Sequence, residues 1–360
     1  MNQRNPCGGS TTQNSDAHFS GLHGIPDIMR ILVSGASGFI GSGLVSALAE
    51  MGHDVCALMR PSASAAHLKG VKFTRLTGDI LDSDSLRRAC QNVDVVFHLA
   101  GLTAARNRQE FFKFNAEGTK NLASAAAQSG TVKRFIFVSS LAASGPSVGL
   151  APKLENDPDY PVSMYGESKL RGELYLDELK GQLPFIVIRP PMVYGPRDRN
   201  VYLFFKSIQK NWMPVLPSRT PTGHKYYSAI HVDDLIQVLV NSLSADPPIF
   251  ERGERFNVSD GQIYTYERIM GLISSELKVK PIRVKVPDTL VSLLASGGTI
   301  AGKILNRSLP LNRDKLNELI SDYWICSSQK AFDQLTFKPK YTLETGVPQT
   351  VAWYKVNGWL

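Results

Sequence analysis

The stretch RILVSGASGFIGSGLVSALAEMGHDVCALMR, residues 30–60, decides the fold of this chain. It opens with a short β-branched and apolar run at residues 30–34, which is the pattern of a buried strand. A glycine-rich turn follows, then apolar residues at helical intervals up to Gly52, and then a second apolar run, DVCALM. The stretch therefore predicts a strand, a tight turn, a helix and a second strand, which together form a β-α-β unit.

The turn carries glycines at G-x-x-G-x-x-G spacing, at Gly35, Gly38 and Gly41. Glycine permits a positive φ, lets backbone N–H groups approach a pyrophosphate, and allows the helix to pack closely on the strand. The N-terminus of the helix then presents its unpaired donors to the anion. Inside a β-α-β unit this spacing predicts a dinucleotide site. The residues between the glycines that we expect to line this site are Ser37, Phe39 and Ile40.

The end of the second predicted strand bears on the choice of dinucleotide. Enzymes that use NAD usually place an acid there for the ribose hydroxyls, whereas an arginine accepts the 2′-phosphate of NADP. This chain has Arg60 at that point and no acid close by. Arg60 therefore favours NADP(H). NAD(H) stays open as well, because an arginine that stacks on adenine suits either cofactor.

Strands and helices continue to alternate along the next hundred residues. The apolar runs VKFTRLTGDI, VDVVFHLAG and RFIFVSS are separated by the helical segments SDSLRRACQ and FNAEGTKNLASAAAQ. This alternation predicts an α/β, Rossmann-type doubly wound parallel sheet. Ligands bind at the carboxyl ends of such strands, and we interpret His98, which lies in apolar sequence there, as structural. The residues expected to reach a ligand at this edge are Asp79, Ile80, Ala100, Gly101 and Ser140.

The segment SMYGESKLRGE, residues 163–173, places Tyr165 and Lys169 four positions apart in good helix-forming sequence. Residues with that spacing are neighbours on one face of a helix. A cation close to a phenol lowers its pKa, so Lys169 and an oxidised nicotinamide together would make Tyr165 a usable acid or base near neutral pH. Ser140, at the end of the preceding strand, would hold the oxygen of a substrate. These three residues are the predicted catalytic group.

Composition excludes several other classes of protein. The chain has 360 residues, 43% of them hydrophobic and 20% charged, which is typical of a globular protein. Its net charge of +8 comes from cations scattered among acids, so we predict no nucleic-acid partner. The four cysteines and seven histidines show neither metal-ligand spacing nor a disulfide framework, which predicts no metal and a reducing, cytoplasmic setting. No apolar run is long enough to span a membrane.

Taken together, the motifs resemble those of the extended short-chain dehydrogenase/reductases, the NAD-dependent epimerase/dehydratase superfamily. The matching segments are GASGFIG, GDI, HLAG, NAEGTKNL, VSSLAASG, YGESK, RPPMVYGPRD and HVDDL. The resemblance implies that the three turn glycines hold the pyrophosphate, that Asp79 contacts the adenine, and that Lys169 contacts the nicotinamide ribose. It also implies that the backbone after Pro190, near Val193, meets the carboxamide. It places Asn115 near the centre of the site, and the predicted substrate residues are Asn115, Met192 and Arg197.

Two departures from the sugar-nucleotide enzymes of the superfamily indicate a branch. Those enzymes carry Asn in R-x-x-N-x-Y-G-P, where this chain has Met192, and often Tyr where it has Ser144. A thioether cannot donate the hydrogen bond of an amide. The chain looks closer to the dihydroflavonol reductase and 3β-hydroxysteroid dehydrogenase-like reductases, which implies interconversion of a secondary alcohol and ketone on an apolar molecule. The alternatives are a nucleotide-sugar epimerase or dehydratase, and a non-catalytic dinucleotide-binding sensor or complex subunit.

The domain boundaries follow from these segments. Residues 1–28 are predicted to be a disordered tail, and 29–195 the dinucleotide-binding domain, to which 231–260 return. Residues 196–230 and 261–360 are predicted to form a smaller, interleaved substrate domain, in which YLFFKSIQKNWMPVLPSRT supplies an apolar pocket wall. Near the C-terminus, Thr336 stands where a glycine is common in the superfamily, which predicts a slightly altered turn.

The sequence contains fewer motifs for binding partners than for the cofactor. A small-molecule substrate is expected, and a homodimer through two long helices is common in the superfamily. The basic segment Lys278–Lys285, followed by the apolar residues 290–304, could rest on an anionic membrane surface. The simpler interpretation, which we favour from the sequence, is a solvated strand followed by a pocket-lining helix.

Overall fold

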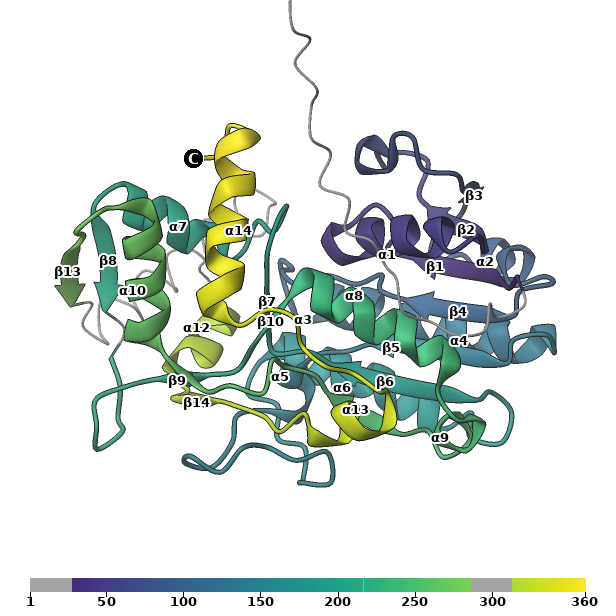
Figure 1. Ribbon diagram of the computed structural model, residues 1–360. Coiled ribbons are helices and arrows are strands. Elements are labelled where there is room, and N and C mark those ends of the chain that lie inside the picture. The colour runs from purple at the N-terminus through teal and green to yellow at the C-terminus, as the bar shows by residue number, and fades with distance from the viewer. Residues whose placement is uncertain (1–27, 216, 286–312) are drawn as a thin grey trace, which may run out of the picture.

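The computed structural model describes residues 28–215, 217–285 and 313–360. Its centre is a seven-stranded sheet in the order β11-β6-β5-β4-β1-β2-β3, in which all neighbouring strands run parallel (Figure 1). The predicted α/β, Rossmann-type doubly wound sheet is confirmed. Its strands are β1 (Arg30–Ser34), β2 (Asp54–Met59), β3 (Thr74–Thr77), β4 (Val95–His98), β5 (Arg134–Val138), β6 (Phe185–Arg189) and β11 (Arg255–Asn257).

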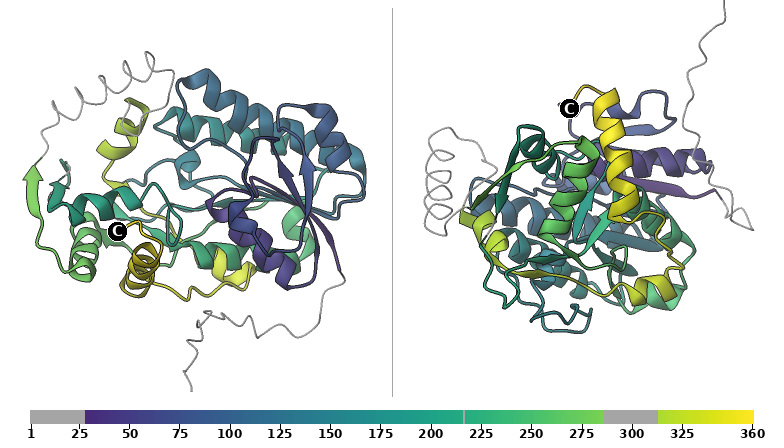
Figure 2. Two further views of the ribbon diagram at one scale, coloured as in Figure 1. Left: turned by 90° about the horizontal axis from the view of Figure 1, so that it is seen from above. Right: turned by 60° about the vertical axis from the view of Figure 1, so that its left-hand side comes forward.

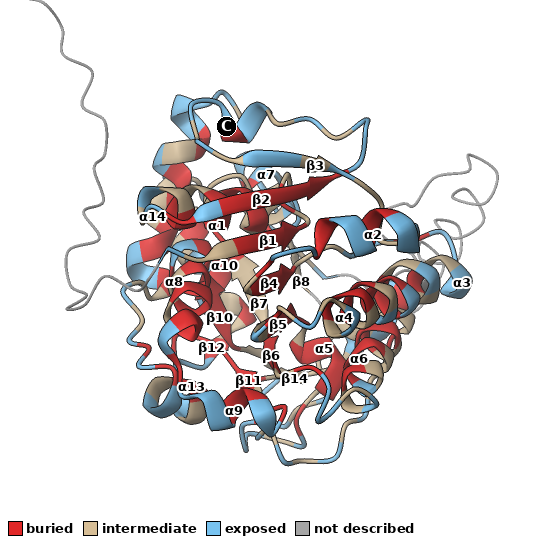
Figure 3. Ribbon diagram, turned by 90° about the vertical axis from the view of Figure 1, so that its right-hand side faces the viewer, coloured by how far each residue is buried: buried red, intermediate tan, exposed pale blue. Residues whose placement is uncertain are grey.

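Helices cover both faces of this sheet, and Figure 3 shows the buried strands between the two helical layers. Since successive side chains of a strand point to opposite faces, a strand covered on both sides is apolar throughout. In β1, Ile31 and Val33 belong to one apolar core, whereas Leu32 belongs to the other. The helices against the first core are α1 (Phe39–Glu50) and α8 (Val232–Asn241), and those against the second are α2 (Ser83–Ala89), α4 (Gly118–Ser129) and α6 (Met164–Asp177).

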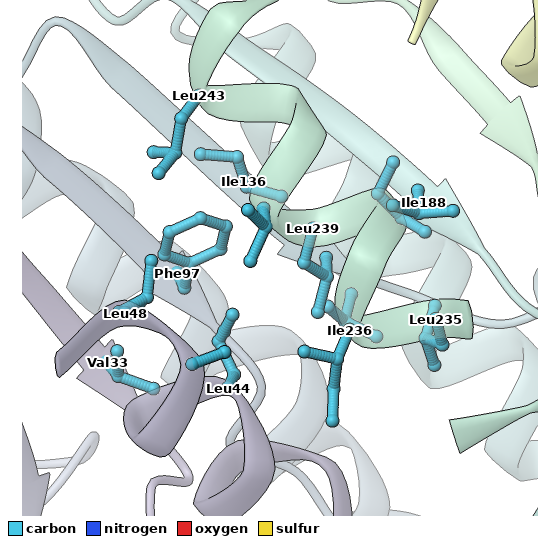
Figure 4. Close-up of a cluster of buried hydrophobic side chains, with 14 of the residues drawn as sticks. Val33, Leu44, Leu48, Phe97, Ile136, Ile188, Leu235, Ile236, Leu239 and Leu243 are labelled. Atoms are coloured by element: carbon cyan, nitrogen blue, oxygen red, sulfur yellow. The ribbon is translucent and has the colours of Figure 1, made fainter. Parts of the chain in front are cut away.

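The first core joins segments that are distant in the sequence. In Figure 4, Leu44 and Leu48 from α1 lie near Phe97 of β4. Leu235, Ile236 and Leu239 come from α8, almost two hundred residues further along the chain, and complete the same cluster. The return of α8 onto this layer explains why HVDDL, which begins α8, is apolar on one face.

A smaller unit lies beside the sheet and is built from short strands and helices. Parallel pairs form between β7 (Met192–Tyr194) and β10 (Ala229–His231), and between β8 (Trp212–Val215) and β13 (Ile282–Lys285). A three-stranded sheet has the order β12 (Tyr264–Thr265), β9 (Tyr226–Tyr227), β14 (Tyr323–Trp324). Its helices are α7 (Tyr202–Gln209), α10 (Tyr266–Leu277), α12 (Arg313–Ile320) and α14 (Leu343–Val356).

Short elements make the remaining connections of the described chain. They are α3 (Arg108–Phe111), α5 (Leu141–Ser144), α9 (Pro247–Glu251) and α13 (Gln329–Gln334), with one-turn 3₁₀ helices at Ala66–Leu68 and Ser242–Ser244. A π-helix, η2 (Phe112–Glu117), joins α3 to α4. A π-helix is rare and often occurs at a functional site, and here it contains Asn115.

The small unit has an apolar core of its own. Phe205 and Ile208 of α7 are buried there with Met213 of β8 and Tyr354 of α14. Three side chains of the segment predicted to supply a pocket wall thus pack inside this unit, and the pocket wall itself stays a prediction. Since β11 extends the main sheet and α8 packs on α1, residues 231–260 lie with the sheet, and we keep the predicted domain boundaries as a proposal.

Two predictions fall on residues 1–27 and 290–304, which lie outside the described residues. Over the ranges that the structure does describe, no helix is both long and apolar enough to cross a bilayer. At the other end of the chain, Thr336 has a φ of +48°. The predicted unusual turn is thus a left-handed position, which a β-branched residue occupies at a cost.

Candidate active site

The glycine-rich turn joins β1 to α1 and requires its glycines for steric reasons. Gly35 has a φ of +71°, and a Cβ on it would lie 2.7 Å from the backbone nitrogen of Ala100. A Cβ on Gly41 would lie 2.2 Å from the carbonyl oxygen of Gly35. The N–H of Gly38 donates to that same carbonyl over 2.9 Å, which closes the turn. The turn brings bare backbone to the first turn of α1, and it therefore fits the pyrophosphate of a dinucleotide.

Arg60 and Asp79 follow adjacent parallel strands, since Met59 at the end of β2 is paired with Thr77 at the end of β3. Arg60 is exposed, and its carbonyl accepts a hydrogen bond from Arg75. The same Arg75 nitrogen also donates to the carbonyls of Pro61 and Ala63. Arg75 therefore holds the loop that carries Arg60. The sequence analysis missed this role, which a single arginine on an edge strand does not reveal.

Tyr165 lies in the first turn of α6, at the same edge of the sheet. The Ser163 hydroxyl begins the helix by accepting the N–H of Gly166 over 3.0 Å. Ser140 similarly caps α5, accepting the N–H of Ala142 over 3.1 Å, and its hydroxyl acts to lower the pKa of Tyr165. Burial raises the pKa of Tyr165 to about 12, against which the Ser140 hydroxyl acts to lower it. At neutral pH the phenol is therefore protonated and next to the serine with which it was predicted to act.

Lys169 is buried and lies one turn further along α6. Its Nζ donates to the carbonyl of Val138 over 2.7 Å and lies 4.5 Å from the centroid of the Phe137 ring. Burial lowers the pKa of Lys169 to about 8, although the Glu173 carboxylate raises it in part. Burial raises the pKa of Tyr165 in this structure, and the combined effect of Lys169 and an oxidised nicotinamide stays a prediction. Burial of the phenol dominates, and the ammonium is directed to the end of β5.

Asn115 supports the structure near the centre of the site, and its predicted contact with a substrate stays a prediction. Its side chain is fully buried, and its Oδ1 accepts the N–H of Leu102 over 2.7 Å. Its Nδ2 donates to the carbonyl of Leu102 and to the hydroxyl of Ser168, each over 2.9 Å. Ser168 donates in turn to the carbonyl of Tyr165. Asn115 therefore ties the turn after β4 to the helix that carries Tyr165 and Lys169, and both N–H groups of its amide are used in doing so.

The remaining predicted residues divide between two places. The carbonyl of Pro190 accepts the N–H of Leu141, beside Ser140, and β7 continues from there through Met192 and Val193.

Arg197 lies elsewhere, because its guanidinium donates to the hydroxyl of Ser42 on α1 over 3.1 Å. It lines a cleft of about 1470 Å³ between α1, α8 and residues 333–341, which includes none of the predicted catalytic residues. The structure thus does not bring Arg197 to the catalytic group.

A buried ion network below the catalytic group was not predicted. Arg189, at the end of β6, is fully buried and pairs with Glu173 of α6 over 2.6 Å and with Asp159 over 2.9 Å. Arg255 of β11 pairs with the same Glu173 over 3.2 Å. The hydroxyl of Ser139, next to Ser140, donates to Glu173 over 2.5 Å. Glu173 follows Lys169 by one helical turn, so the network fixes the rotation of α6 about its axis.

His98 fulfils the structural role predicted for it. It is fully buried and hydrogen-bonded to Ser34 over 2.7 Å and to Thr119 over 2.9 Å. Burial lowers its pKa to about 3, with Lys169 adding to the effect, so the ring stays neutral. Its hydrogen bonds link β1, β4 and α4 beneath the site.

Helix α12 contributes two acids that sequence reasoning also missed. The carboxylate of Asp314 accepts the N–H groups of Met164 (2.5 Å) and Tyr165 (3.3 Å) at the N-terminus of α6. Glu318 accepts the hydroxyl of Ser163 over 2.9 Å and acts to raise the pKa of Tyr165. These residues are about 150 positions from α6 in the sequence, so no local pattern could reveal them.

The comparisons with known proteins agree with this geometry. Residues 31–259 match the model of the NAD dependent epimerase/dehydratase family. A ceramide reductase of Caulobacter vibrioides is 30% identical over 92% of this chain and 96% of its own length. A 3-beta-hydroxysteroid dehydrogenase of Mycolicibacterium neoaurum is 33% identical over 49% of this chain and 50% of its own length. The structure of a UDP-glucose 4-epimerase of Thermotoga maritima with UDP-glucose has a TM-score of 0.73, at 25% identity, and covers 91% of this chain and 99% of the epimerase.

The matched segment contains the glycine turn, the catalytic group and β7, and it extends through most of the chain that forms the main sheet. The glycine turn fits a dinucleotide, and Tyr165, Ser140 and the buried Lys169 lie together at the carboxyl edge. This chain belongs to the NAD dependent epimerase/dehydratase family.

Proposed function

We propose that this protein is an NAD(P)-dependent oxidoreductase that interconverts a secondary alcohol and a ketone on an apolar small molecule. The observation that carries the proposal is the grouping of Tyr165 and Ser140, both half-buried, with the buried Lys169 at the carboxyl edge of the sheet, where the Ser140 hydroxyl acts on the pKa of Tyr165. A dinucleotide, when bound, supplies or accepts the hydride. The glycine turn would hold its pyrophosphate.

The roles of the protein's own residues follow from their protonation. Because the pKa of Tyr165 is about 12, the phenol carries its proton at neutral pH and donates it to a ketone oxygen during reduction. In the opposite direction the phenolate accepts the proton of the alcohol. The Ser140 hydroxyl holds the same oxygen. Lys169, whose pKa is about 8, supplies positive charge below that pH and favours the phenolate once it forms.

An apolar substrate is supported by β7 and by the relatives. Met192 in β7 offers a thioether, which provides none of the hydrogen bonds that an amide gives to a sugar nucleotide. It is partly buried against the apolar core of the small unit. Two of the similar proteins are a ceramide reductase and a 3-beta-hydroxysteroid dehydrogenase, which favours a lipid-like alcohol or ketone.

We also propose that NADP(H) is the preferred cofactor. Arg60 is exposed at the end of β2, and its loop is held by Arg75, so a guanidinium is available to a 2′-phosphate. NAD(H) would bind the same turn without that contact.

The proposal is tested by measuring NADP⁺ reduction with a ceramide and a 3β-hydroxysteroid as apolar probes and UDP-glucose as a polar one. Turnover is expected with an apolar probe, and Tyr165→Phe should lower it by about 10²–10⁴-fold, because the proton transfer is lost. Tyr175→Phe, on the same helix but outside the group, is the matched control. Unchanged turnover in Tyr165→Phe would rule out the proposed acid and base.

A second candidate function is a nucleotide-sugar epimerase with the same tyrosine and lysine. The likeness to the UDP-glucose 4-epimerase over nearly the whole chain favours it. Conversion of UDP-glucose to a second sugar nucleotide, with no net change in the cofactor and no turnover of the apolar probes, would replace the first proposal by this one. A chain that binds dinucleotide and converts none of the probes would instead favour the non-catalytic alternative.

A further inference from the structure

The outer edge of the small unit combines exposed apolar side chains with unpaired cations. There β8 and β13 form a two-stranded parallel sheet, and Figure 2 shows green β13 at the margin of the molecule. We call this surface the basic ledge and define it by the exposed residues Lys210, Trp212, Lys278, Lys280, Ile282, Arg283 and Lys285.

The apolar part of the basic ledge is a cross-strand pair. Trp212 and Ile282 are direct partners in the register of β8 and β13. Paired residues of parallel strands project to the same face, and Trp212 is 59% and Ile282 67% exposed. The next residue of β8, Met213, is buried in the core of the small unit. One face of the two-stranded sheet thus packs on the core of the small unit, and the other exposes Trp212 and Ile282.

The charged part flanks that pair along the chain, and because side chains alternate along β13, Arg283 and Lys285 project to the side of the ribbon opposite Ile282. Lys210 precedes Trp212 by two positions, Lys280 precedes Ile282 by two, and the N–H of Ile282 donates to the carbonyl of Asn211, which holds the two strand ends together. None of the five cations of the ledge forms an ion pair with an acid in the described ranges. Elsewhere on the surface, by contrast, Arg268 pairs with Glu344 and Arg106 with Glu110. Within the described residues the ledge therefore carries positive charge that no acid neutralises by an ion pair.

We propose that the basic ledge docks on an anionic lipid bilayer. Tryptophan and aliphatic side chains enter the boundary between headgroups and acyl chains, while lysine and arginine around them bind anionic headgroups. Stacking on a nucleic acid would call for several aromatic side chains among the cations, whereas here Trp212 is paired with the aliphatic Ile282. The proposal concerns binding and is independent of the proposed reaction.

The test is co-sedimentation of the full chain with vesicles of phosphatidylglycerol and phosphatidylcholine, or of phosphatidylcholine alone. Binding is expected to the anionic vesicles at low salt and to weaken at high salt. Lys210→Glu with Lys280→Glu should weaken it about thirtyfold or more, since each cation near the surface contributes about 1 kcal/mol. Trp212→Ser with Ile282→Ser should also weaken it, and more at high salt, where the apolar contact dominates.

Two matched controls separate the effect of the ledge from the effects of net charge and of exposed apolar side chains elsewhere on the surface. Lys69→Glu with Lys72→Glu changes the net charge by the same amount at exposed sites outside the ledge and should leave most binding intact. Val148→Ser removes an apolar side chain that is 95% exposed and should have no effect. Equal losses in both charge-reversal variants would overturn the proposal, as would no sedimentation of the unaltered chain. Binding of a DNA duplex that is lost in the ledge variants, without vesicle binding, would also overturn it.

Discussion

Glu173 of α6 and Arg189 of β6 are buried and paired charges, whereas the charges of the basic ledge are exposed and have no acidic partner within the described residues. Arg189 and Glu173 are both inaccessible to solvent, and each has at least two ionic or hydrogen-bonding partners. Lys280 and Arg283 are solvated. A buried charge without its partner is strongly destabilising, while an exposed one costs little. Charge near α6 therefore serves the fold and the orientation of the site, and charge on the ledge is free for a partner.

The largest effect is expected where the buried network is broken. Glu173→Gln leaves Arg189 without its main counter-charge and should lower the free energy of unfolding by about 3–5 kcal/mol. The matched control is Glu344→Gln, which breaks an exposed pair with Arg268 and should cost less than about 1 kcal/mol. Urea denaturation followed by circular dichroism measures both. Similar losses in the two variants would contradict the contrast drawn between buried and exposed charge.

The second largest effect is expected at Lys169, a buried cation of the predicted catalytic group. Its pKa of about 8 lies below the ordinary value for lysine, so the positive charge is present below pH 8 and lost above it. The rate of ketone reduction should fall about tenfold between pH 7 and pH 9 as that charge disappears. Lys169→Arg, which stays charged, should remove this decline, whereas Lys180→Arg should not. A decline that persists in Lys169→Arg would assign it to another group.

The third prediction concerns Arg60, an exposed cation that is proposed to bind the 2′-phosphate of NADPH. Arg60→Ala should raise the dissociation constant of NADPH by about tenfold and leave that of NADH nearly unchanged, because a bidentate guanidinium–phosphate contact is lost. Lys69→Ala, another exposed cation, is the control. Isothermal titration of each cofactor gives the four constants. Equal weakening of both cofactors would favour stacking of Arg60 on adenine over recognition of the 2′-phosphate.

The smallest expected effect concerns the backbone and leaves charge unchanged. Thr336 is exposed and holds a φ of +48°, so Thr336→Gly should relieve strain and stabilise the chain by about 0.5–1 kcal/mol after the larger backbone entropy of glycine is subtracted. The melting temperature should rise by a degree or more. Gly52→Ala, at a φ of +85°, is the opposite change and should lower it. A fall in both variants would show that Thr336 is held by contacts that outweigh the strain.

The sequence predicted the parts of the molecule whose cause is local. The glycines of residues 35–41 are required by contacts within one turn, and the apolar strands alternate with helices at short range, so the sheet and the dinucleotide turn could be predicted. Tyr165 and Ser140 were placed together because both follow from strand ends and helix starts. The direction of the Tyr165 pKa could not be predicted, since it depends on burial by the assembled structure.

The errors and omissions arise from contacts between distant segments. Arg197 donates a hydrogen bond to Ser42, 155 positions away in the sequence. The Asn115 amide nitrogen donates to Leu102 and to Ser168. Glu173 and Arg189 lie in helix and strand patterns that gave no sign of their pairing. Spacing along a chain specifies which face of an element a residue occupies, but not which other element will meet it.

The contact between Asp314 and the first turn of α6 has a consequence for protein engineering. Two backbone N–H groups of the catalytic helix are satisfied by a carboxylate that belongs to the last fifth of the chain. Anyone who grafts a different C-terminal segment onto this scaffold, to change what it accepts, must therefore supply an equivalent anion at that place. Without one, the graft would disturb the tyrosine that it was meant to reuse.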